Sequence, residues 1–148
     1  MKPLAPVVGV GGVVVRDGRA LLIRRGKPPL YGRWVVPGGT VELGETLEEA
    51  LVREMAEETS LVVEPLEVLT VFDRIERDAG EVSYHFVIVD YLCRWVSGEA
   101  QAASDALEVA WATPAQLPGY DPPAKTLEVV GDAFRRYAVL APAAGAGG

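Results

Sequence analysis

The feature that most constrains the fold of this chain is the stretch of residues 39–61. Its later part, Leu47–Thr59, predicts a helix, because it lacks proline and consists mostly of good helix formers. Thr46 and Glu49 have the spacing of a capping box, in which a hydroxyl and a carboxylate bind the unpaired amides of the first turn. Apolar residues recur at helical spacing and predict a stripe that packs on a core: Leu47, Leu51 and Met55.

Three glutamates crowd one turn of this predicted helix. Glu54, Glu57 and Glu58 fall within an arc about 100° wide. Like charges at this spacing destabilise a helix, and the helix C-terminus disfavours anions. A bound cation would compensate for both effects, and Mg²⁺ prefers carboxylate oxygens, water and substrate phosphates as ligands. The alternative is a solvated acidic face, which is common on surface helices.

Additional residues at fixed positions favour the functional interpretation. Gly39 is followed after five residues by Glu45, and Arg53 comes after seven more. Together with the three glutamates, these residues resemble the signature box of the Nudix hydrolases, which cleave nucleoside diphosphates linked to another group. Ser60 is the one departure, because the family usually has glycine at this helix end. The resemblance is dense over residues 39–61 and thins to general architecture across residues 7–139.

The resemblance implies a fold and a set of metal ligands. The fold is α/β (α+β), an α/β/α sandwich with a mixed β-sheet between helices. The chemistry depends on Mg²⁺, with Mn²⁺ as a substitute. The metal shell would contain the backbone carbonyl of Gly39 and the carboxylates of Glu54, Glu57 and Glu58. For Gly39 taken alone, the alternative is a simple turn.

Arg53 and a general base complete the implied catalytic set. By resemblance, Arg53 pairs with Glu45 and orients a metal-binding carboxylate. The alternative for Arg53 is a plain surface ion pair. The group that takes the proton from the attacking water is left open between a box glutamate, such as Glu57 or Glu54, and a later loop residue. In that loop Glu108 is preferred over Asp105, because family members often place an extra carboxylate there.

A basic, proline-containing loop precedes the box. Arg24, Arg25 and Arg33 are candidates to hold phosphate oxygens or another substrate group. The alternative, which the sequence does not separate from the first, is a solubilising surface loop. Trp34 and the sole histidine, His85, are interpreted as structural, the first in a core and the second through a hydrogen bond.

Charge and composition exclude several classes. The net charge of −7 argues against nonspecific binding to nucleic acid or to a membrane surface, but not against a small-molecule nucleotide whose charge a metal offsets. The lone Cys93 excludes an intramolecular disulfide and a cysteine-based zinc cluster. Neither a signal peptide nor a membrane-spanning run is evident, so the cytoplasm is the expected location. The family resemblance leaves a homodimer open.

The length of 148 residues suits one domain, expected over residues 1–140, with a disordered tail at 141–148. Asp17 and Gly18 lie between two apolar runs and predict a hairpin. Residues 81–96 are apolar on both faces, which predicts a central strand covered on both sides. The elements expected from the pattern are strands at 7–15, 20–23, 61–63, 68–77, 81–96 and 109–112, a helical turn from 113, and a last helix at 124–140.

The function expected from these features is Mg²⁺-dependent hydrolysis of a nucleoside diphosphate linked to another group. ADP-ribose or a nucleoside diphosphate sugar is the first choice of substrate. A mutator-type enzyme that sanitises damaged (d)NTPs is the alternative. An interpretation of another class is a noncatalytic nucleotide-binding sensor, which the intact acidic set disfavours.

Overall fold

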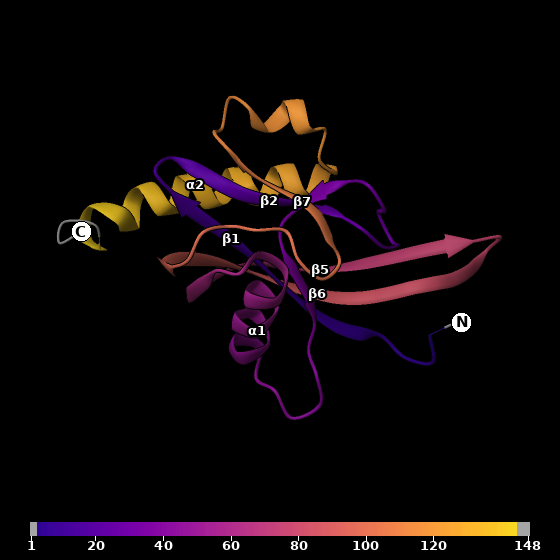
Figure 1. Cartoon of the computed structure of the whole chain (residues 1–148). Coiled ribbons are helices and arrows are strands. Elements are labelled where there is room, and N and C mark those ends of the chain that lie inside the picture. The colour runs from indigo at the N-terminus through magenta and orange to yellow at the C-terminus, as the bar shows by residue number, and fades with distance from the viewer. Residues whose placement is uncertain (1–2, 145–148) are drawn as a thin grey trace.

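The computed structural model describes residues 3–144, with side chains described for 3–140. It contains a mixed, seven-stranded sheet between two α-helices (Figure 1), which confirms the predicted fold class. Its elements, in chain order, are β1 (Val7–Arg16), β2 (Arg19–Arg25), β3 (Trp34–Val35), β4 (Gly38–Thr40), α1 (Leu47–Thr59), β5 (Val62–Asp78), β6 (Glu81–Ser97), β7 (Ala106–Ala112), the 3₁₀-helix η1 (Leu117–Tyr120) and α2 (Ala124–Ala144). No helix in this part of the chain has the length and apolar composition needed to cross a membrane.

The sheet is arranged around β1. Its strand order is β3-β2-β1-β6-β5, with β4 also paired to β1 and β7 to β2. Only the β1–β6 pair among these is parallel. Asp17 and Gly18 both have positive φ and turn the chain from β1 into β2, as their pattern predicts. Because Gly39 of β4 lies opposite Val10 of β1, the sheet fixes the start of the loop that leads into α1.

The two faces of the sheet form separate cores, because successive residues of a strand point to opposite sides. On β1, Val10 and Val14 join the core under α1, together with Leu51 and Met55 of that helix. Val13 and Val15 join the core under α2. The helices therefore cover opposite faces, as Figure 1 shows.

Helix α1 has the predicted bounds, Leu47–Thr59, and the predicted cap. The Glu49 amide donates to Thr46 Oγ1 at 3.1 Å, and the Thr46 amide donates to the Glu49 carboxylate at 2.9 Å. Leu51 and Met55 are fully buried. The cap and the apolar stripe fix both the start of the helix and the direction in which its acidic turn faces.

Ser60 ends α1 in the left-handed conformation, with φ at 65°, and its amide donates to the Ala56 carbonyl at 3.0 Å. This conformation costs a residue with a Cβ about 1 kcal/mol relative to glycine. We therefore expect Ser60→Gly to raise the free energy of unfolding by about that amount, measured by urea denaturation. Ser97→Gly, at the end of β6, is the control and should give no gain. An unchanged or lower stability of Ser60→Gly would contradict this account of the cap.

Three predictions about the strands need correction. The separate strands expected at 61–63 and 68–77 are one strand, β5, because register shifts absorb Pro65 on a sheet edge, where no partner needs its missing amide. Strand β6 lies centrally between β1 and β5, but only Val89–Cys93 is buried. Its start, Glu81–His85, lies beyond the end of β1 and projects with β5 as a two-stranded ribbon (Figure 1). The last strand begins at Ala106 rather than 109.

The structure also tests the predictions for the C-terminal part of the chain. The turn expected from Thr113 is confirmed, because the amides of Gln116 and Leu117 donate to the Thr113 carbonyl at 3.0 Å, and it leads into the 3₁₀-helix η1. Helix α2 continues to Ala144, so residues 141–144 of the expected tail are helical. Alanine, which supplies most of these residues, extends a helix by propensity and needs no burial to do so. The rest of the expected tail, 145–148, lies outside the described residues.

Candidate active site

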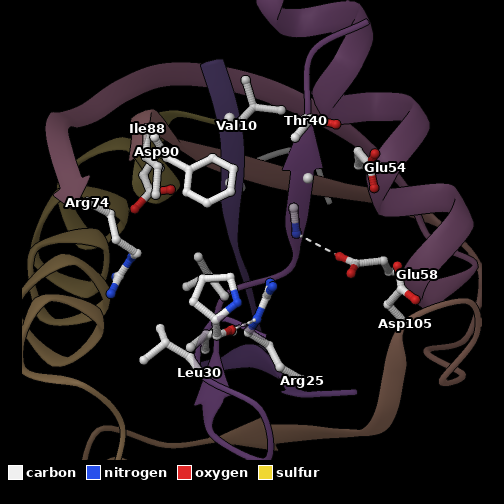
Figure 2. Close-up of a pocket in the computed structure, with 18 of the residues that line it drawn as sticks. Val10, Arg25, Leu30, Thr40, Glu54, Glu58, Arg74, Ile88, Asp90 and Asp105 are labelled. Carbon is white, nitrogen blue, oxygen red and sulfur yellow. Dashed lines mark hydrogen bonds between the residues drawn. The ribbon is translucent and has the colours of Figure 1, made fainter. Parts of the chain in front are cut away.

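A cavity of about 390 Å³ lies where the acidic turn of α1, the glycine-rich parts of β1 and β4, the β5–β6 ribbon and the start of α2 meet. The box residues Gly39, Glu54, Glu57 and Glu58 line it. Figure 2 shows Glu54 and Glu58 on one side of the cavity, Asp90 and Arg74 on the other, and Arg25 below them. The cavity therefore joins the predicted metal-binding turn to a second group of polar side chains.

Two glycines give this cavity its space. A Cβ added at Gly39 would overlap the carboxylate of Glu54, and a Cβ added at Gly11 would overlap the carboxylate of Asp90. The absence of a side chain at both positions therefore makes room for a carboxylate.

Arg53 holds several carboxylates at once. Its Nε and Nη2 donate to the two oxygens of Glu45 at 2.7 and 2.8 Å, which confirms the predicted pair. Its Nη1 donates to Glu54 at 2.9 Å and to Glu57 at 3.2 Å, and Nη2 also donates to the Thr40 carbonyl at 3.0 Å. The Arg53 hydrogen bonds lower the pKa of Glu45 to about 2. Arg53 thus orients two of the three box glutamates and ties α1 to the loop after β4.

Glu58 is the buried member of the acidic turn, with 4% of its surface exposed. The Gly38 amide donates to its Oε1 at 2.7 Å. Burial raises the pKa of Glu58 to about 7, and the charge of Glu54 adds to this, while the Gly38 hydrogen bond and the charges of Arg25 and Lys27 oppose it. A carboxylate with a pKa near neutrality and a fixed position has the properties of a general base or of a cation ligand.

The donor set of the acidic turn suits a hard divalent cation. Each of Glu54, Glu57 and Glu58 uses one carboxylate oxygen in the hydrogen bonds described above, and its second oxygen accepts none from the described residues. The backbone of Gly39 also approaches the carboxylate of Glu54 closely. Among the described side chains, however, no three acidic, histidine or cysteine groups are already gathered around one point. The shared metal shell therefore stays a prediction.

Only one of the three predicted basic residues lies at the cavity. Arg25 lines the cavity, and its Nε donates to the Pro29 carbonyl at 2.7 Å. Arg24 points to the other face of β2, where its Nη1 lies 3.0 Å from Glu108 Oε2, its cross-strand neighbour on β7. Arg33 donates to the Asp121 carbonyl at 3.1 Å. Arg24, Arg33 and Glu108 do not line the cavity, so the structure does not bring these three predicted residues to the site.

The structure also shows where Asp105, Trp34 and His85 lie. Asp105, the less favoured loop carboxylate, lines the cavity and pairs with Lys27 at 2.8 Å. Trp34 packs edge-to-face on Tyr120, with ring centroids 5.1 Å apart, which confirms a structural role. His85 lies on β6 outside the cavity lining. Its side chain forms no hydrogen bond with the described residues, so the expected hydrogen bond is absent.

Part of the cavity was missed from the sequence. Asp90 on β6 is only 4% exposed, and its carboxylate faces the cavity. Burial raises its pKa to about 6, while the charges of Arg74 and Lys125 oppose the rise. The sequence signal that could have revealed it is an aspartate within the apolar run 86–93 of this strand. Among the other lining residues that the sequence did not indicate are Phe72, Arg74, Tyr84, Phe86 and Lys125.

These pKa shifts predict how stability depends on pH without divalent ions. Between its ordinary pKa of 4.5 and about 7, Glu58 binds a proton more readily in the folded state, so the free energy of unfolding should fall as pH rises through this window, by on the order of 3 kcal/mol. Asp90 acts in the same direction between 3.8 and about 6. Glu45 acts oppositely at lower pH, where stability is lost as pH falls from 4.5 towards about 2.

Urea denaturation in EDTA at pH 4.5 to 7.5 measures this dependence. Glu58→Gln should flatten the slope, because it removes the titrating group. Glu48→Gln, an exposed position on the same helix, should leave the slope as it is. Equal slopes in the Glu58→Gln variant and the wild type would show that burial of Glu58 does not shift its pKa.

Comparison with known families and proteins gives a consistent result. The family model of the NUDIX domain matches residues 5–130. An ADP-ribose pyrophosphatase of Methanocaldococcus jannaschii is 39% identical over 105 residues, which cover 71% of this chain and 60% of that protein. A putative 8-oxo-dGTP diphosphatase 2 of Mycobacterium tuberculosis is 38% identical over 113 residues, covering 76% of this chain and 77% of that protein.

Among solved structures, a MutT NUDIX hydrolase from Burkholderia pseudomallei superposes with a TM-score of 0.75 at 35% identity, covering 86% of this chain and 98% of that one. The chain spans less than two thirds of the length of the Methanocaldococcus relative. Sequence and fold therefore agree on one family, while the matched relatives carry names that refer to different nucleotides.

Proposed function

This chain belongs to the NUDIX domain family, and from that premise we propose that it is a divalent-metal-dependent pyrophosphohydrolase. It would cleave a nucleoside diphosphate linked to another group, with water as the second substrate. The observation that carries the proposal is the arrangement of Arg53, which pairs with Glu45 and holds Glu54 and Glu57 at one wall of a cavity. A solvated acidic helix face would need neither an arginine that binds several of its glutamates nor a cavity in front of it.

The proposed metal ligands are the carboxylates of Glu54, Glu57 and Glu58 and the carbonyl of Gly39. When bound, Mg²⁺ or Mn²⁺ would neutralise charge on the diphosphate and lower the pKa of a coordinated water. Arg53 orients Glu54 and Glu57, since it donates to both. Gly38 holds Glu58 through its backbone amide. The chain thus fixes each carboxylate from one side and leaves its other oxygen for a ligand.

Glu58 is the proposed proton acceptor. It is buried beside the cavity, the Gly38 amide holds one of its oxygens, and the other accepts no hydrogen bond from the described residues. Glu108, the loop residue favoured from the sequence, pairs with Arg24 outside the cavity lining and is the weaker candidate. On the opposite side of Glu58, Arg25 and Lys27 line the same cavity and would hold phosphate oxygens.

ADP-ribose or a nucleoside diphosphate sugar is the first choice of substrate. In support, the Methanocaldococcus relative is named an ADP-ribose pyrophosphatase. A mutator-type (d)NTP pyrophosphohydrolase is the second candidate, because the Mycobacterium relative, of which a larger share is matched, is named a putative 8-oxo-dGTP diphosphatase. Each candidate contains a phosphoanhydride and a nucleobase.

A substrate panel tests the proposal. Purified protein is incubated with Mg²⁺ and ADP-ribose, nucleotide sugars, dinucleoside polyphosphates and oxidised dNTPs, and products are separated by chromatography. Running the reaction in ¹⁸O-labelled water identifies the phosphorus that is attacked. We expect release of a nucleoside monophosphate that depends on divalent ions. Nucleotide binding in calorimetry with no product over hours would refute the proposal and favour a noncatalytic sensor.

A further inference from the structure

The β5–β6 side of the cavity has a composition different from that of the acidic turn. Tyr84, Phe86, Ile88 and Asp90 alternate along β6, so they share one face of the strand. Across the pair, Phe72 lies opposite Ile88, and Arg74 opposite Phe86. All six side chains line the cavity. The ribbon therefore presents a row of rings that ends in one carboxylate.

The rings of this row are held in place. Tyr84 and Phe86 stack with ring centroids 6.2 Å apart and an interplanar angle of 14°. Phe72 has two cations over its ring, Arg74 at 5.7 Å and Lys125 of α2 at 5.1 Å. A flat, ordered apolar surface beside a polar group is what a nucleobase requires, since a base has a π-face and a polar edge.

Asp90 supplies the polar group. Its side chain is more than nine-tenths buried, yet within the described residues it forms neither a hydrogen bond nor an ion pair within 4 Å. Arg74 and Lys125 act on it only at longer range. No enclosed side-chain oxygen or nitrogen of the described residues lacks a hydrogen-bond partner, so the unpaired oxygens of Asp90 open into the cavity and are free to accept from a ligand. Gly11 gives it space by having no side chain, so two strands cooperate to keep an unpaired acceptor at the cavity wall.

We propose that Asp90 reads the amino edge of the substrate nucleobase, with the base lying against the rings of Phe72, Tyr84 and Phe86. An ionised carboxylate only accepts hydrogen bonds, so it selects a base that presents N–H donors, such as adenine or guanine, over one that has lost its amino group. The inference rests on the proposed function for the identity of the substrate as a nucleotide. It adds which end of the cavity holds the base and which residue sets base preference.

The geometry of the cavity supports this orientation. Figure 2 shows Asp90 and Arg74 across the cavity from Glu54 and Glu58. A nucleotide with its diphosphate at the acidic turn would extend its base towards the ribbon. Gly9 and Gly11 line the intervening wall of β1, where side chains would block this path.

Binding of nucleoside monophosphates tests the inference without any need for catalysis. Calorimetry at pH 8 compares AMP with its 6-deamino form, purine riboside monophosphate, and GMP with its 2-deamino form, IMP. In wild type, the amino form of at least one pair should bind roughly 10- to 100-fold more tightly, as expected for a hydrogen bond to a charged group. Asp90→Asn should bring that ratio of affinities close to one, because it should weaken the binding of the amino form only. Asp73→Asn, exposed on the other face of β5, should leave it unchanged.

The same titrations can overturn the inference. Absence of a preference in wild type, or equal weakening of both members of a pair by Asp90→Asn, would mean that Asp90 does not read the base. If 2′-deoxy- or 3′-deoxy-AMP binds the wild type more weakly than AMP does, and Asp90→Asn removes this difference, the carboxylate binds a ribose hydroxyl instead. Failure of the proposed hydrolysis would appear separately, as a lack of products in the substrate panel while these binding ratios persist.

Discussion

Replacement of Glu58 by glutamine is expected to reduce kcat by roughly 10²- to 10⁴-fold, the range typical of losing a general base. Glutamine keeps the shape and can still accept from the Gly38 amide, but it can neither take a proton nor supply a charged ligand. Turnover of the best substrate from the panel, at saturating Mg²⁺, measures the loss. The fold should be retained, because a neutral side chain is less costly to bury at this position than a carboxylate.

Glu48→Gln is the matched control for this substitution. Glu48 is an exposed glutamate in the first turn of the same helix, away from the cavity lining. Its activity should equal that of wild type within a factor of about two, since surface changes of this kind have small effects. Comparable turnover by Glu58→Gln and wild type would remove Glu58 from the chemistry and weaken the assignment of the acidic turn.

Arg53→Lys is expected to lower kcat/KM by roughly 10- to 100-fold and to raise the Mg²⁺ concentration needed for half-maximal rate by a similar factor. Lysine keeps the charge but cannot make two parallel hydrogen bonds to Glu45 while also donating to Glu54 and Glu57. The carboxylates would then lose their common orientation. A titration of rate against Mg²⁺ at fixed substrate separates this effect from weaker substrate binding.

Arg94→Lys provides the comparison for Arg53→Lys. Arg94 also donates to a glutamate, Glu64 at 3.1 Å, but this pair is exposed near the end of β6 and lies outside the cavity lining. The Arg94→Lys rate and its Mg²⁺ dependence should match wild type. If Arg53→Lys loses thermal stability but keeps its kinetics and Mg²⁺ dependence, Arg53 is only a structural tie between α1 and β4.

The sequence was most informative where local rules decide the structure. The cap at Thr46 and the apolar stripe fixed the bounds of α1, and Asp17 and Gly18 fixed the first hairpin. The resemblance of residues 39–61 to the family box implied a pair between Glu45 and Arg53, and the structure contains it. Each of these features depends on residues within one helix, one turn or one short loop, so the chain pattern alone carries the information.

The rest of the site depends on pairing between distant segments. Strand periodicity shows that Arg24 and Arg25 point to opposite faces, but it does not show which face meets the cavity. Asp90 reaches the site only because β6 pairs in parallel with β1 and leaves Gly11 opposite it. The continuity of β5 through Pro65 likewise follows from its place at the sheet edge.

The most direct test of the central claim is a crystal structure with Mn²⁺ and a nonhydrolysable α,β-methylene analogue of ADP-ribose. We predict an anomalous difference peak beside the carboxylates of Glu54, Glu57 and Glu58 and the carbonyl of Gly39, within reach of the diphosphate oxygens. Ordered glutamates and an ordered analogue with no such peak, or with the ion at another place, would contradict the account.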